Sequence, residues 1–365
     1  MQKWNKISFT ELISDRTKDG IKLPTNEYNQ SGLTAIIDQG QEFIAGYSDE
    51  TEGAFIDVPA IIFGDHTRVF KYVDFPFFLG ADGVKVLKAN QEINYKYLYY
   101  YFLQAKFPNT GYARHFKWLK ELQIPLPPLE TQKNIAAVLD KCTALIAKHK
   151  LMLEKYDTLI KSRFIEMFGD PVQNPMKWEK KNLSEWCTKV TDGTHDTPPR
   201  YTSGVLLLTG KNIRADHIDF SEIEYVSPED HKIIYERCNP EYGDVLYTNI
   251  GVNYGTAVLN TLDYQFSMKN IALLKPKRDL VSGYYLWFVL NLLRNKILDE
   301  NKTGGAQTFM SLATIRNLII PMPPLSLQND FAAFVQQIDK SKFAVQKSLE
   351  KAETLYKSLM QKYFG

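Results

Sequence analysis

The first candidate for chemistry is a glycine-rich segment in the second half of the chain. Residues 204–212, GVLLLTGKN, place two glycines and a lysine in the order of a phosphate-binding loop. That loop needs four residues between its glycines, and a Ser or Thr after the Lys to reach Mg²⁺. Here five residues intervene and Asn212 follows the Lys. The segment therefore does not predict a nucleotide site.

A second candidate is the proline pair at residues 198–199, inside the sequence Asp-Thr-Pro-Pro-Arg. Amino-methyltransferases carry a related motif, in which an acidic or Asn residue precedes the prolines and an aromatic residue follows them. Those two neighbours hold and stack the target base, but Thr197 and Arg200 occupy their places here. The pair therefore does not predict methyl transfer.

The six histidines offer no metal or acid–base constellation. No two of them lie at a spacing typical of metal ligands. In two places a His adjoins an Asp, at Asp65-His66 and His195-Asp196, and such a pair in a loop is more typical of a turn. We therefore predict that this chain has no catalytic residue, no bound metal and no cofactor of its own.

The composition is that of an ordinary folded protein. A length of 365 residues suggests about two domains, and 44% hydrophobic with 24% charged residues excludes a disordered chain. The three cysteines lie far apart and fit neither a disulfide framework nor a zinc knuckle, which predicts a reducing, cytoplasmic location. The sequence has no signal-peptide core and no run of about 18 apolar residues, so we expect no membrane association.

An internal repeat organises the chain. Residues 124–169 and 320–365 align without a gap at an offset of 196, and 17 of 46 positions are identical. Both copies open on Ile-Pro-x-Pro-Pro-Leu and end on Phe-Gly. A weaker match joins residues 4–11 to residues 178–185, at an offset of 174. The repeat predicts two related units, each a globular head followed by a long segment.

Each repeated segment predicts one long helix. Its opening prolines cannot lie inside a helix, and about 40 residues without Pro or Gly follow before a final Gly. Apolar residues recur with a period close to seven, and Lys342 is the one clear misfit in the second copy. The two stripes of the first copy comprise Leu139, Ile146, Leu153, Ile160 and Met167, and Ile135, Cys142, His149, Tyr156 and Arg163.

Such stripes need a partner helix, and each copy offers one to the other. We expect two antiparallel helices on the order of 60 Å long, packed as a coiled coil. The two units would then be related by an approximate internal two-fold axis. A coiled coil that dimerises two chains is the alternative, although duplication within one chain already supplies the partner.

Both heads have a mixed α/β pattern. Strand-like runs separated by turn residues occur at Ala54–Phe63, Gly204–Leu208, Asp244–Thr248 and Ile271–Leu274. Each head then has an aromatic helix, and these helices are predicted at Tyr95–Leu103 and Tyr284–Leu293. Apart from their edges, the two heads barely resemble each other. The predicted α/β organisation is a first head at 1–123, a long helix at 124–170, a second head at 171–319 and a long helix at 320–365.

Divergent heads that alternate with repeated segments, opening on PLPPLETQ and ending on MFGDP, resemble the specificity subunits of type I restriction-modification systems. The resemblance covers essentially the whole chain, and its most specific parts are residues 125–132 and 321–328. It implies that each head is a target-recognition domain for one half of a split, asymmetric site in double-stranded DNA. It implies also that the helices set the spacer between the halves and dock two methyltransferase subunits.

The same resemblance implies that a nuclease–translocase subunit completes the restriction enzyme. S-adenosylmethionine, and ATP with Mg²⁺, would then belong to the partner subunits. This chain would be a non-catalytic, sequence-specific DNA-binding subunit.

Contact with bases needs Arg, Lys, Asn, Gln and small hydroxyls on exposed loops, and contact with phosphates needs Lys, Arg, Tyr and backbone amides. In the first head the candidate DNA-binding residues are Lys18, Lys22, Asn26, Tyr28, Gln30, His66, Thr67, Arg68 and Lys71. In the second head they are Thr194, His195, Arg200, Tyr201, Lys211, Asn212, Arg214, Asn249, Asn253, Tyr254, Lys269 and Asn270. The candidate partner-binding residues in the repeats are Gln132, Phe168, Gln328 and Phe364.

Two alternatives stay open. The chain could serve a methyltransferase-only or a type II-like restriction system, which the sequence does not separate from type I. It could also be a scaffold or anti-restriction protein without DNA contact, which the net charge of only +2 favours. A DNA affinity that falls steeply with salt would count against the scaffold.

Overall fold

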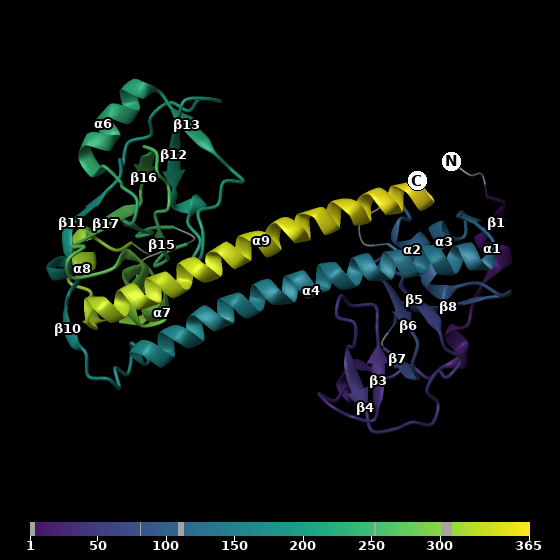
Figure 1. The fold of residues 1–365 in the computed structure, drawn as a ribbon. Helices are drawn as coiled ribbons and strands as arrows, with labels where there is room; N and C mark the ends of the chain where they lie inside the picture. Colours follow the sequence, from purple (N-terminus) through teal and green to yellow (C-terminus); the bar gives the residue numbers. More distant parts are fainter. Residues whose placement is uncertain (1–3, 81, 109–112, 252, 301–308) are drawn as a thin grey trace. The chain divides into compact units, whose positions relative to one another are not determined.

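The computed structural model describes residues 4–80, 82–108, 113–251, 253–300 and 309–365. The chain forms two compact units. Unit 1 comprises Met1–Leu151 and Val345–Gly365, and unit 2 comprises Met152–Ala344. Each unit holds a mixed α/β body and parts of two long helices (Figure 1). Within the described ranges, no helix combines the length and the apolar character that crossing a membrane requires.

The two long helices are α4 (Leu129–Phe168) and α9 (Leu325–Phe364), and each spans 40 residues. Every position of the predicted stripes is buried or half-buried, as expected if the stripes face other parts of the protein. The misfit Lys342 is accommodated by an ion pair, because its Nζ lies 2.6 Å from Asp157 Oδ1 in unit 2. The period of seven therefore predicted the buried faces of both helices.

Within each unit, the parts of α4 and α9 run in opposite directions. In unit 1, Ile135 and Leu139 belong to one apolar cluster with Met360, and Lys150 Nζ lies 3.4 Å from Glu353 Oε1. In unit 2, Lys342 meets Asp157, whereas the Phe331 ring lies 5.3 Å from that of Phe164. In both units, the further along α4 a residue lies, the nearer to the start of α9 its partner lies. The two helices are therefore antiparallel within each unit.

The head of unit 1 is built from short strands and two further helices after its opening turn. The elements are β1 (Lys6–Ser8), α1 (Phe9–Leu12), β2 (Ile13–Asp15), η1 (Thr17–Asp19), η2 (Thr25–Glu27), β3 (Thr34–Ile37), β4 (Gly46–Ser48), β5 (Ala60–Gly64), β6 (Phe70–Val73), β7 (Phe77–Leu79), β8 (Val84–Ala89), α2 (Tyr95–Leu103), α3 (Phe116–Leu119) and β9 (Gln123–Pro125). They form three sheets, with strand orders β1-β9, β2-β8-β5-β6 and β4-β3-β7. Among the described strands of this head, β3 and β7 pair in parallel and the other strand pairs are antiparallel.

The head of unit 2 follows the same plan. The elements are β10 (Glu179–Asn182), α5 (Leu183–Trp186), β11 (Cys187–Asp192), β12 (Val205–Thr209), η3 (Gly210–Asn212), β13 (Glu224–Val226), α6 (Pro228–Cys238), β14 (Val245–Tyr247), β15 (Ala257–Leu259), β16 (Ser267–Lys269), β17 (Ala272–Pro276), α7 (Gly283–Glu300), α8 (Leu312–Arg316) and β18 (Ile319–Met322). The strand orders are β10-β18, β11-β17-β14-β15 and β13-β12-β16, and β12 and β16 pair in parallel.

Strand for strand, the three sheets of the two heads have the same order and the same directions. The agreement extends to isolated bridges. Lys22 pairs in parallel with Leu79, as Thr194 does with Lys269 at the equivalent place. The two heads therefore share one scaffold, although their sequences barely resemble each other.

Each head is fastened to its long helix by a set of hydrogen bonds that we call the glutamine clamp. In unit 1, Gln132 Nε2 donates to the Pro127 carbonyl at 2.8 Å, and its Oε1 accepts from the Asn94 amide at 2.9 Å. The Tyr97 hydroxyl, on α2, donates to the Pro125 carbonyl at 2.8 Å. The clamp thus joins the start of α2 to the proline-rich turn before α4.

The clamp recurs in unit 2 with equivalent residues. Gln328 Nε2 donates to the Pro323 carbonyl at 2.8 Å, and its Oε1 accepts from the Ser282 amide at 2.8 Å. The Tyr285 hydroxyl donates to the Pro321 carbonyl at 2.7 Å. The repeated Pro and Gln residues are therefore explained by internal fastening.

The structure corrects three of the predicted partner-binding residues, because their side chains are buried within the chain. Gln132 and Gln328 are 2% and 0% exposed and make the clamp, and Phe168 is 2% exposed and packs on Tyr285. None of these three presents its side chain to a partner. Phe364, the fourth, is half-buried.

Candidate nucleic-acid interface

The candidate interface of unit 2 forms where the parallel strands β12 and β16 end side by side. Thr209 lies opposite Lys269 at these ends, and Asn270 turns the chain with a left-handed φ of 53°. The loop after β14 reaches the same place through Ile250 and Gly251. Together they enclose a pocket of about 410 Å³. The lining residues are Arg200, Thr209, Gly210, Lys211, Glu224, Ile250, Gly251, Asn253, Lys269 and Asn270.

The pocket brings together five of the residues predicted from the sequence. These are Arg200, Lys211, Asn253, Lys269 and Asn270. Arg200 Nε lies 2.7 Å from Glu224 Oε2, Lys269 Nζ donates to the Thr197 hydroxyl, and Asn253 Nδ2 donates to the Gly210 carbonyl at 2.9 Å. Three cations and one carboxylate therefore meet at one end of the sheets.

These groups have the chemistry that DNA contacts require. Arg and Lys donate to the guanine edge or to phosphate, Asn can donate to and accept from adenine, and a carboxylate accepts from the cytosine amine. Lys211 is exposed, whereas the side chain of Arg200 is 29% exposed and already oriented by Glu224. The arrangement can therefore contact both a base edge and the phosphate beside it.

His195 lies beside this pocket and is held in place from two sides. Its Nδ1 lies 3.1 Å from Asn270 Oδ1 and its Nε2 lies 2.8 Å from Asp192 Oδ2. Asp192 is buried and also meets Arg237 Nη2, at 2.6 Å. Sequence reasoning missed Asp192 and Arg237. Asp192 lies only three residues before His195 but belongs to strand β11, and Arg237 lies 45 residues from Asp192, so no local pattern joins the three side chains.

Four candidate residues of the second head are buried, and the structure corrects their assignment as DNA contacts. They are Thr194, Asn212, Asn249 and Tyr254. Asn212 illustrates the reason. Its Oδ1 accepts from the Thr209 amide at 2.9 Å, and its Nδ2 donates to the carbonyls of Asp219 and Glu222, both at 3.0 Å. A side chain that organises a loop from inside cannot also contact a ligand.

The other two candidates of this head do not line the pocket. Arg214 is half-buried and donates through Nη2 to Asp219 Oδ2 at 2.8 Å. Tyr201 is exposed, and its backbone pairs with that of Tyr225. Both stay predictions.

In unit 1 the equivalent end of the sheets is organised by Gln39, just after β3. Its Nε2 donates to the Asp82 carbonyl at 2.8 Å, its Oε1 accepts from the His66 amide at 3.3 Å, and its backbone carbonyl accepts from the Thr67 hydroxyl at 2.6 Å. Arg68 follows with a left-handed φ of 63°. Gln39 therefore fixes the turn that carries three of the predicted residues. The only signal for it in the sequence is a polar residue just after the apolar run of β3.

The remaining candidates of unit 1 separate into exposed residues and one buried residue. Lys18, Lys22, Asn26 and Gln30 are exposed and Tyr28 is half-buried, all on the loop between β2 and β3. Lys22 Nζ lies 3.3 Å from Asp82 Oδ1, which brings that loop to the end organised by Gln39. These residues stay predictions.

Lys71 is a correction. It is 4% exposed, and its Nζ donates to the Asp38 carbonyl at 2.9 Å and to the Glu42 carbonyl. Burial lowers the pKa of Lys71, and the carboxylates of Asp38 and Glu42 oppose this effect. Lys71 therefore supports the loop after β3 from inside and does not contact DNA.

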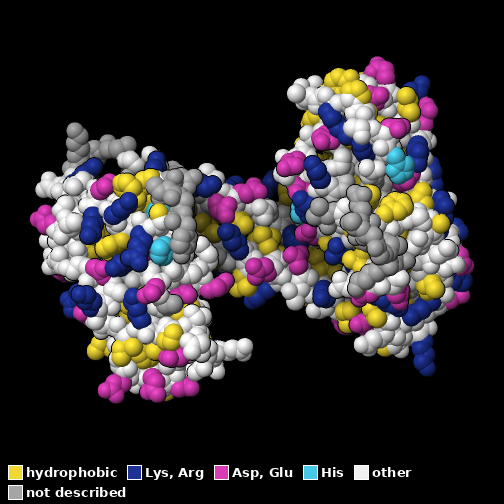
Figure 2. Space-filling view, turned by 180° about the vertical axis from the view of Figure 1, so that it is seen from behind, with side chains coloured by type: hydrophobic (Ala, Val, Ile, Leu, Met, Phe, Trp, Pro, Cys, Tyr) yellow, Lys and Arg dark blue, Asp and Glu magenta, His cyan; other side chains and the backbone are white. Residues whose placement is uncertain are grey.

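Charge is mixed on the face of the molecule that Figure 2 shows. On the face shown in Figure 2, Lys and Arg side chains of both units are interspersed with Asp and Glu. In the described ranges, no group of three or more His, Cys, Asp or Glu side chains is arranged to hold a metal ion.

Comparison with known proteins decides the family. A family model described as the type I restriction modification DNA specificity domain matches residues 1–155 and 175–353. The chain belongs to this family. The two matched segments include most of both heads, and they agree with the role in DNA sequence specificity expected from the sequence.

Curated relatives carry the same description. The chain is 24% identical over 269 residues to the type I restriction enzyme EcoKI specificity subunit of Escherichia coli K12. This match covers 67% of the present chain and 57% of the relative. It is 31% identical over 162 residues to the EcoR124I/EcoR124II specificity subunit of Escherichia coli, in a match that covers 40% of this chain and 39% of the relative. It is 25% identical over 315 residues to the MjaVIII specificity subunit of Methanocaldococcus jannaschii, in a match that covers 78% of this chain and 74% of the relative. The matches thus span 57% and 39% of the lengths of the two Escherichia coli relatives.

Solved structures agree on the fold. The crystal structure of a type I restriction-modification S subunit from M. genitalium superposes with a TM-score of 0.71 at 17% identity, over 99% of this chain and 96% of that one. A chain from a structural study of complex assembly and conformational transition of the type I system superposes with a TM-score of 0.53 at 18% identity. This superposition covers 100% of the present chain and 98% of the other. At such identities the likeness shows the fold alone.

Proposed function

We propose that this chain is the DNA-recognition subunit of a type I restriction-modification complex and that each head recognises one half of a split site. The heads are residues 1–123 and 171–319. Residues 124–170 and 320–365, which contain α4 and α9, set the spacer and dock two methyltransferase subunits. Methyl transfer and cleavage, with S-adenosylmethionine and with ATP and Mg²⁺, take place in the partner subunits.

The observation that carries the proposal is the shared scaffold of the heads. The same strand order presents different side chains at the same end, with Arg200, Lys211 and Lys269 in unit 2, and Lys22 and Arg68 in unit 1. Two scaffolds of one plan with different loops are what two different half-sites require. The family match supports the role in specificity.

The test uses the chain assembled with its methyltransferase subunits in a host whose methylome is sequenced. Arg200→Ala removes the guanidinium that Glu224 orients, and should relax one base position of one half-site by about 1–3 kcal/mol, or roughly 5- to 150-fold. Lys211→Ala should instead weaken binding to all sequences and reduce the slope of log affinity against log salt by about 0.9.

Lys232→Ala is the matched control, because Lys232 is an exposed lysine on α6 that does not line the pocket. It should leave the methylated site and the salt slope unchanged. The proposal fails if Arg200→Ala leaves the methylome identical, or if it changes both half-sites together.

A further inference from the structure

A histidine at the candidate interface of unit 2 contacts a hydrogen-bonding group at each ring nitrogen. His195 Nε2 lies 2.8 Å from Asp192 Oδ2, and His195 Nδ1 lies 3.1 Å from Asn270 Oδ1. Asn270 lines the pocket and takes a left-handed φ of 53° at the turn after β16. The ring therefore links a carboxylate to an amide group in the wall of the pocket.

The carboxylate end of this link is fixed. Asp192, on β11, is 3% exposed, and its Oδ1 accepts from Arg237 Nη2 at 2.6 Å. Arg237 lies in the last turn of α6, where its backbone carbonyl accepts from Lys189 Nζ at 2.8 Å. An ionised carboxylate can only accept hydrogen bonds, so the nitrogen of His195 that faces Asp192 carries a hydrogen. Groups outside the pocket therefore hold that hydrogen on Nε2.

The amide end of the link has two possible arrangements. An Asn side chain can present either its oxygen or its NH₂ group to the same partner by turning its amide through half a turn. If both ring nitrogens of His195 carry a hydrogen, Nδ1 donates and Asn270 must turn its oxygen toward the ring. If only Nε2 carries one, Nδ1 accepts and Asn270 must turn its NH₂ group toward the ring. In either case, the other half of the amide is left for the pocket.

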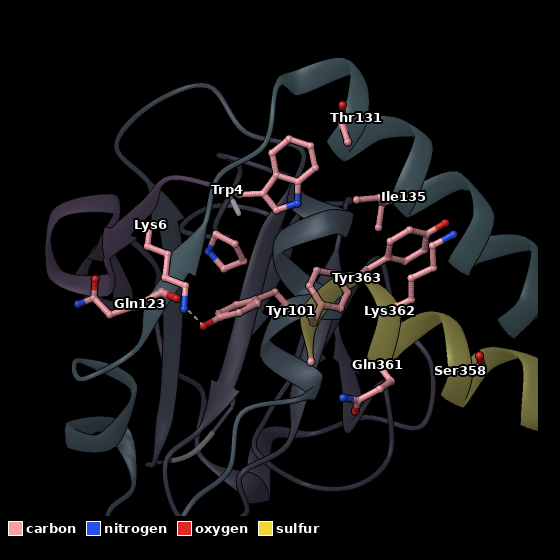
Figure 3. Close-up of a pocket in the computed structure, with 13 residues that line it drawn as sticks. Trp4, Lys6, Tyr101, Gln123, Thr131, Ile135, Ser358, Gln361, Lys362 and Tyr363 are labelled. Atoms are coloured by element: carbon pink, nitrogen blue, oxygen red, sulfur yellow. Dashed lines mark hydrogen bonds between the residues drawn. The ribbon is translucent and has the colours of Figure 1, made fainter. Parts of the chain in front are cut away.

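A bond in unit 1 shows the opposite case. In the aromatic pocket of Figure 3, of about 950 Å³, the Tyr101 hydroxyl donates to the Gln123 carbonyl at 3.0 Å. A carbonyl only accepts, and burial raises the pKa of Tyr101, so this bond keeps its direction throughout the physiological pH range. The bond between His195 and Asn270 has no fixed direction, because each partner can donate or accept.

The surroundings of His195 allow its ring to gain and lose a proton. The charged groups on the elements around it are Asp192 on β11, Arg237 on α6, Lys269 on β16 and Asp196 in the same loop. The side chain is 54% exposed, so water reaches the ring. Histidine is the side chain that changes charge between about pH 5 and 8. The direction of the bond to Asn270 can therefore follow the pH.

We propose that His195 is a positioning residue that decides whether Asn270 presents a hydrogen-bond donor or an acceptor to DNA, so that the base preference of this half-site changes with pH. Doubly protonated His195 leaves the NH₂ group of Asn270 to donate to guanine O6 or N7 or to thymine O4. Neutral His195 leaves the oxygen to accept from the amino group of adenine or cytosine. The inference rests on the proposed function, because it concerns how the same pocket selects a base.

The test uses the chain assembled with its methyltransferase subunits. The methylome gives the split site, and exchange of residues 171–319 assigns the half-site of unit 2. The affinity for this site is then compared with that for duplexes changed at one base pair, at about pH 5.5 and about pH 8.5. The measured quantity is the ratio of the two affinities, because an added positive charge attracts the phosphates of both duplexes alike.

At one position of the unit 2 half-site, the ratio should change by about fivefold or more between the two pH values. His195→Gln should make the ratio independent of pH. Asn270→Gly, which tolerates the left-handed φ, should do the same. His217→Gln is the matched control and should keep the parent profile. His217 is also exposed and lies 2.8 Å from an aspartate, Asp216, but it does not line the pocket.

Two results would overturn the inference and leave the proposed function standing. The first is a ratio that stays constant while all affinities fall with rising pH, which would make His195 only a cation for phosphates. The second is a pH-dependent ratio that survives His195→Gln, with thermal unfolding showing that the variant is folded. Absence of any split site in the methylome would refute the proposed function, and this inference with it.

Discussion

Removal of the clamp glutamine in unit 2 should lower the stability of that unit by several kcal/mol. Gln328 is 0% exposed, and it satisfies the Ser282 amide and the Pro323 carbonyl, each at 2.8 Å. Gln328→Ala leaves both backbone groups unpaired inside the protein. An unsatisfied buried polar group costs about 1–3 kcal/mol, so the two together predict a loss of about 2–6 kcal/mol.

The assay is urea unfolding of the full chain, followed by tryptophan fluorescence. With a slope of about 2 kcal/mol per molar urea, the predicted loss lowers the midpoint of the unit 2 transition by about 1–3 M. Gln337→Ala, an exposed glutamine on the same helix, is the control and should stay within about 0.5 kcal/mol of the parent. A midpoint for Gln328→Ala equal to that of Gln337→Ala would refute the role of the clamp.

Three further predictions follow from burial and from the two-head organisation. Burial raises the pKa of Tyr284 to about 12 and also raises that of Tyr247, whereas unfolded tyrosine titrates near 10. Above about pH 10 the folded state therefore binds more protons than the unfolded state, so the free energy of unfolding measured in urea should fall as pH rises from about 10 to 12. Tyr284→Phe should make that fall less steep. A flat profile for the parent would contradict this. Burial raises the pKa of Cys187 to about 12 and that of Cys238 to about 11, so both thiols should react with an aromatic disulfide reagent far more slowly in the folded than in the urea-unfolded chain, and equal rates would count against their burial. Exchange of residues 1–123 for the head of another specificity subunit should change one half-site in the methylome and keep the other, and a change in both would contradict independent heads.

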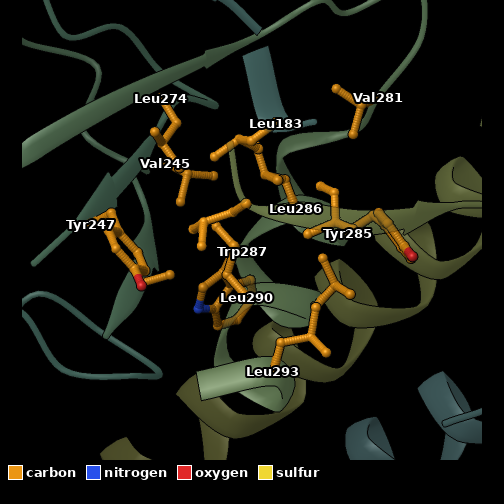
Figure 4. Packing of buried hydrophobic residues seen from close by; sticks show 14 of the residues in the cluster. Leu183, Val245, Tyr247, Leu274, Val281, Tyr285, Leu286, Trp287, Leu290 and Leu293 are labelled. Carbon is orange, nitrogen blue, oxygen red and sulfur yellow. The ribbon is translucent and has the colours of Figure 1, made fainter. Parts of the chain in front are cut away.

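The long helices and the aromatic helices could be predicted from the sequence because their apolar pattern is local. Helix α2 has the predicted bounds, Tyr95–Leu103, whereas α7 is longer than predicted and runs to Glu300. The apolar run at 284–293 contains most of the buried residues of α7, and Ile297 beyond it belongs to the same buried cluster. Figure 4 shows Leu286 and Leu290 in the same packed cluster as Val245, in β14.

The strands were predicted less completely. Strands β12, β14 and β17 lie within about two residues of predicted runs, but the run from Ala54 forms a strand only over β5 (Ala60–Gly64). Pro59 precedes β5 and has no N–H to give to a ladder. Most strands of the heads have three to five residues. Some pair with the next strand, as β5 does with β6, but others pair with distant strands, as β1 does with β9 and β2 with β8, so no local pattern fixes the sheet order.

Burial of individual polar residues was the hardest feature to predict. Lys71, Asn212 and Gln328 have side chains typical of exposed sites, and each is buried because backbone carbonyls and amides from other segments surround it. Those partners come together only in the folded chain. The residues of the pocket in unit 2 were recognisable because their segments are loops between strands, where exposed polar groups gather.

The glutamine clamp has a consequence for the evolution of such chains. In each unit it contacts the start of the aromatic helix through a backbone amide, that of Asn94 or Ser282, whose side chains differ. From the head it requires only that amide and one tyrosine, Tyr97 or Tyr285. Genes that recombine within the repeated proline-rich stretches could therefore acquire an entire foreign head in one event and keep a stable joint. New specificities could then spread by shuffling whole heads as well as by point mutation.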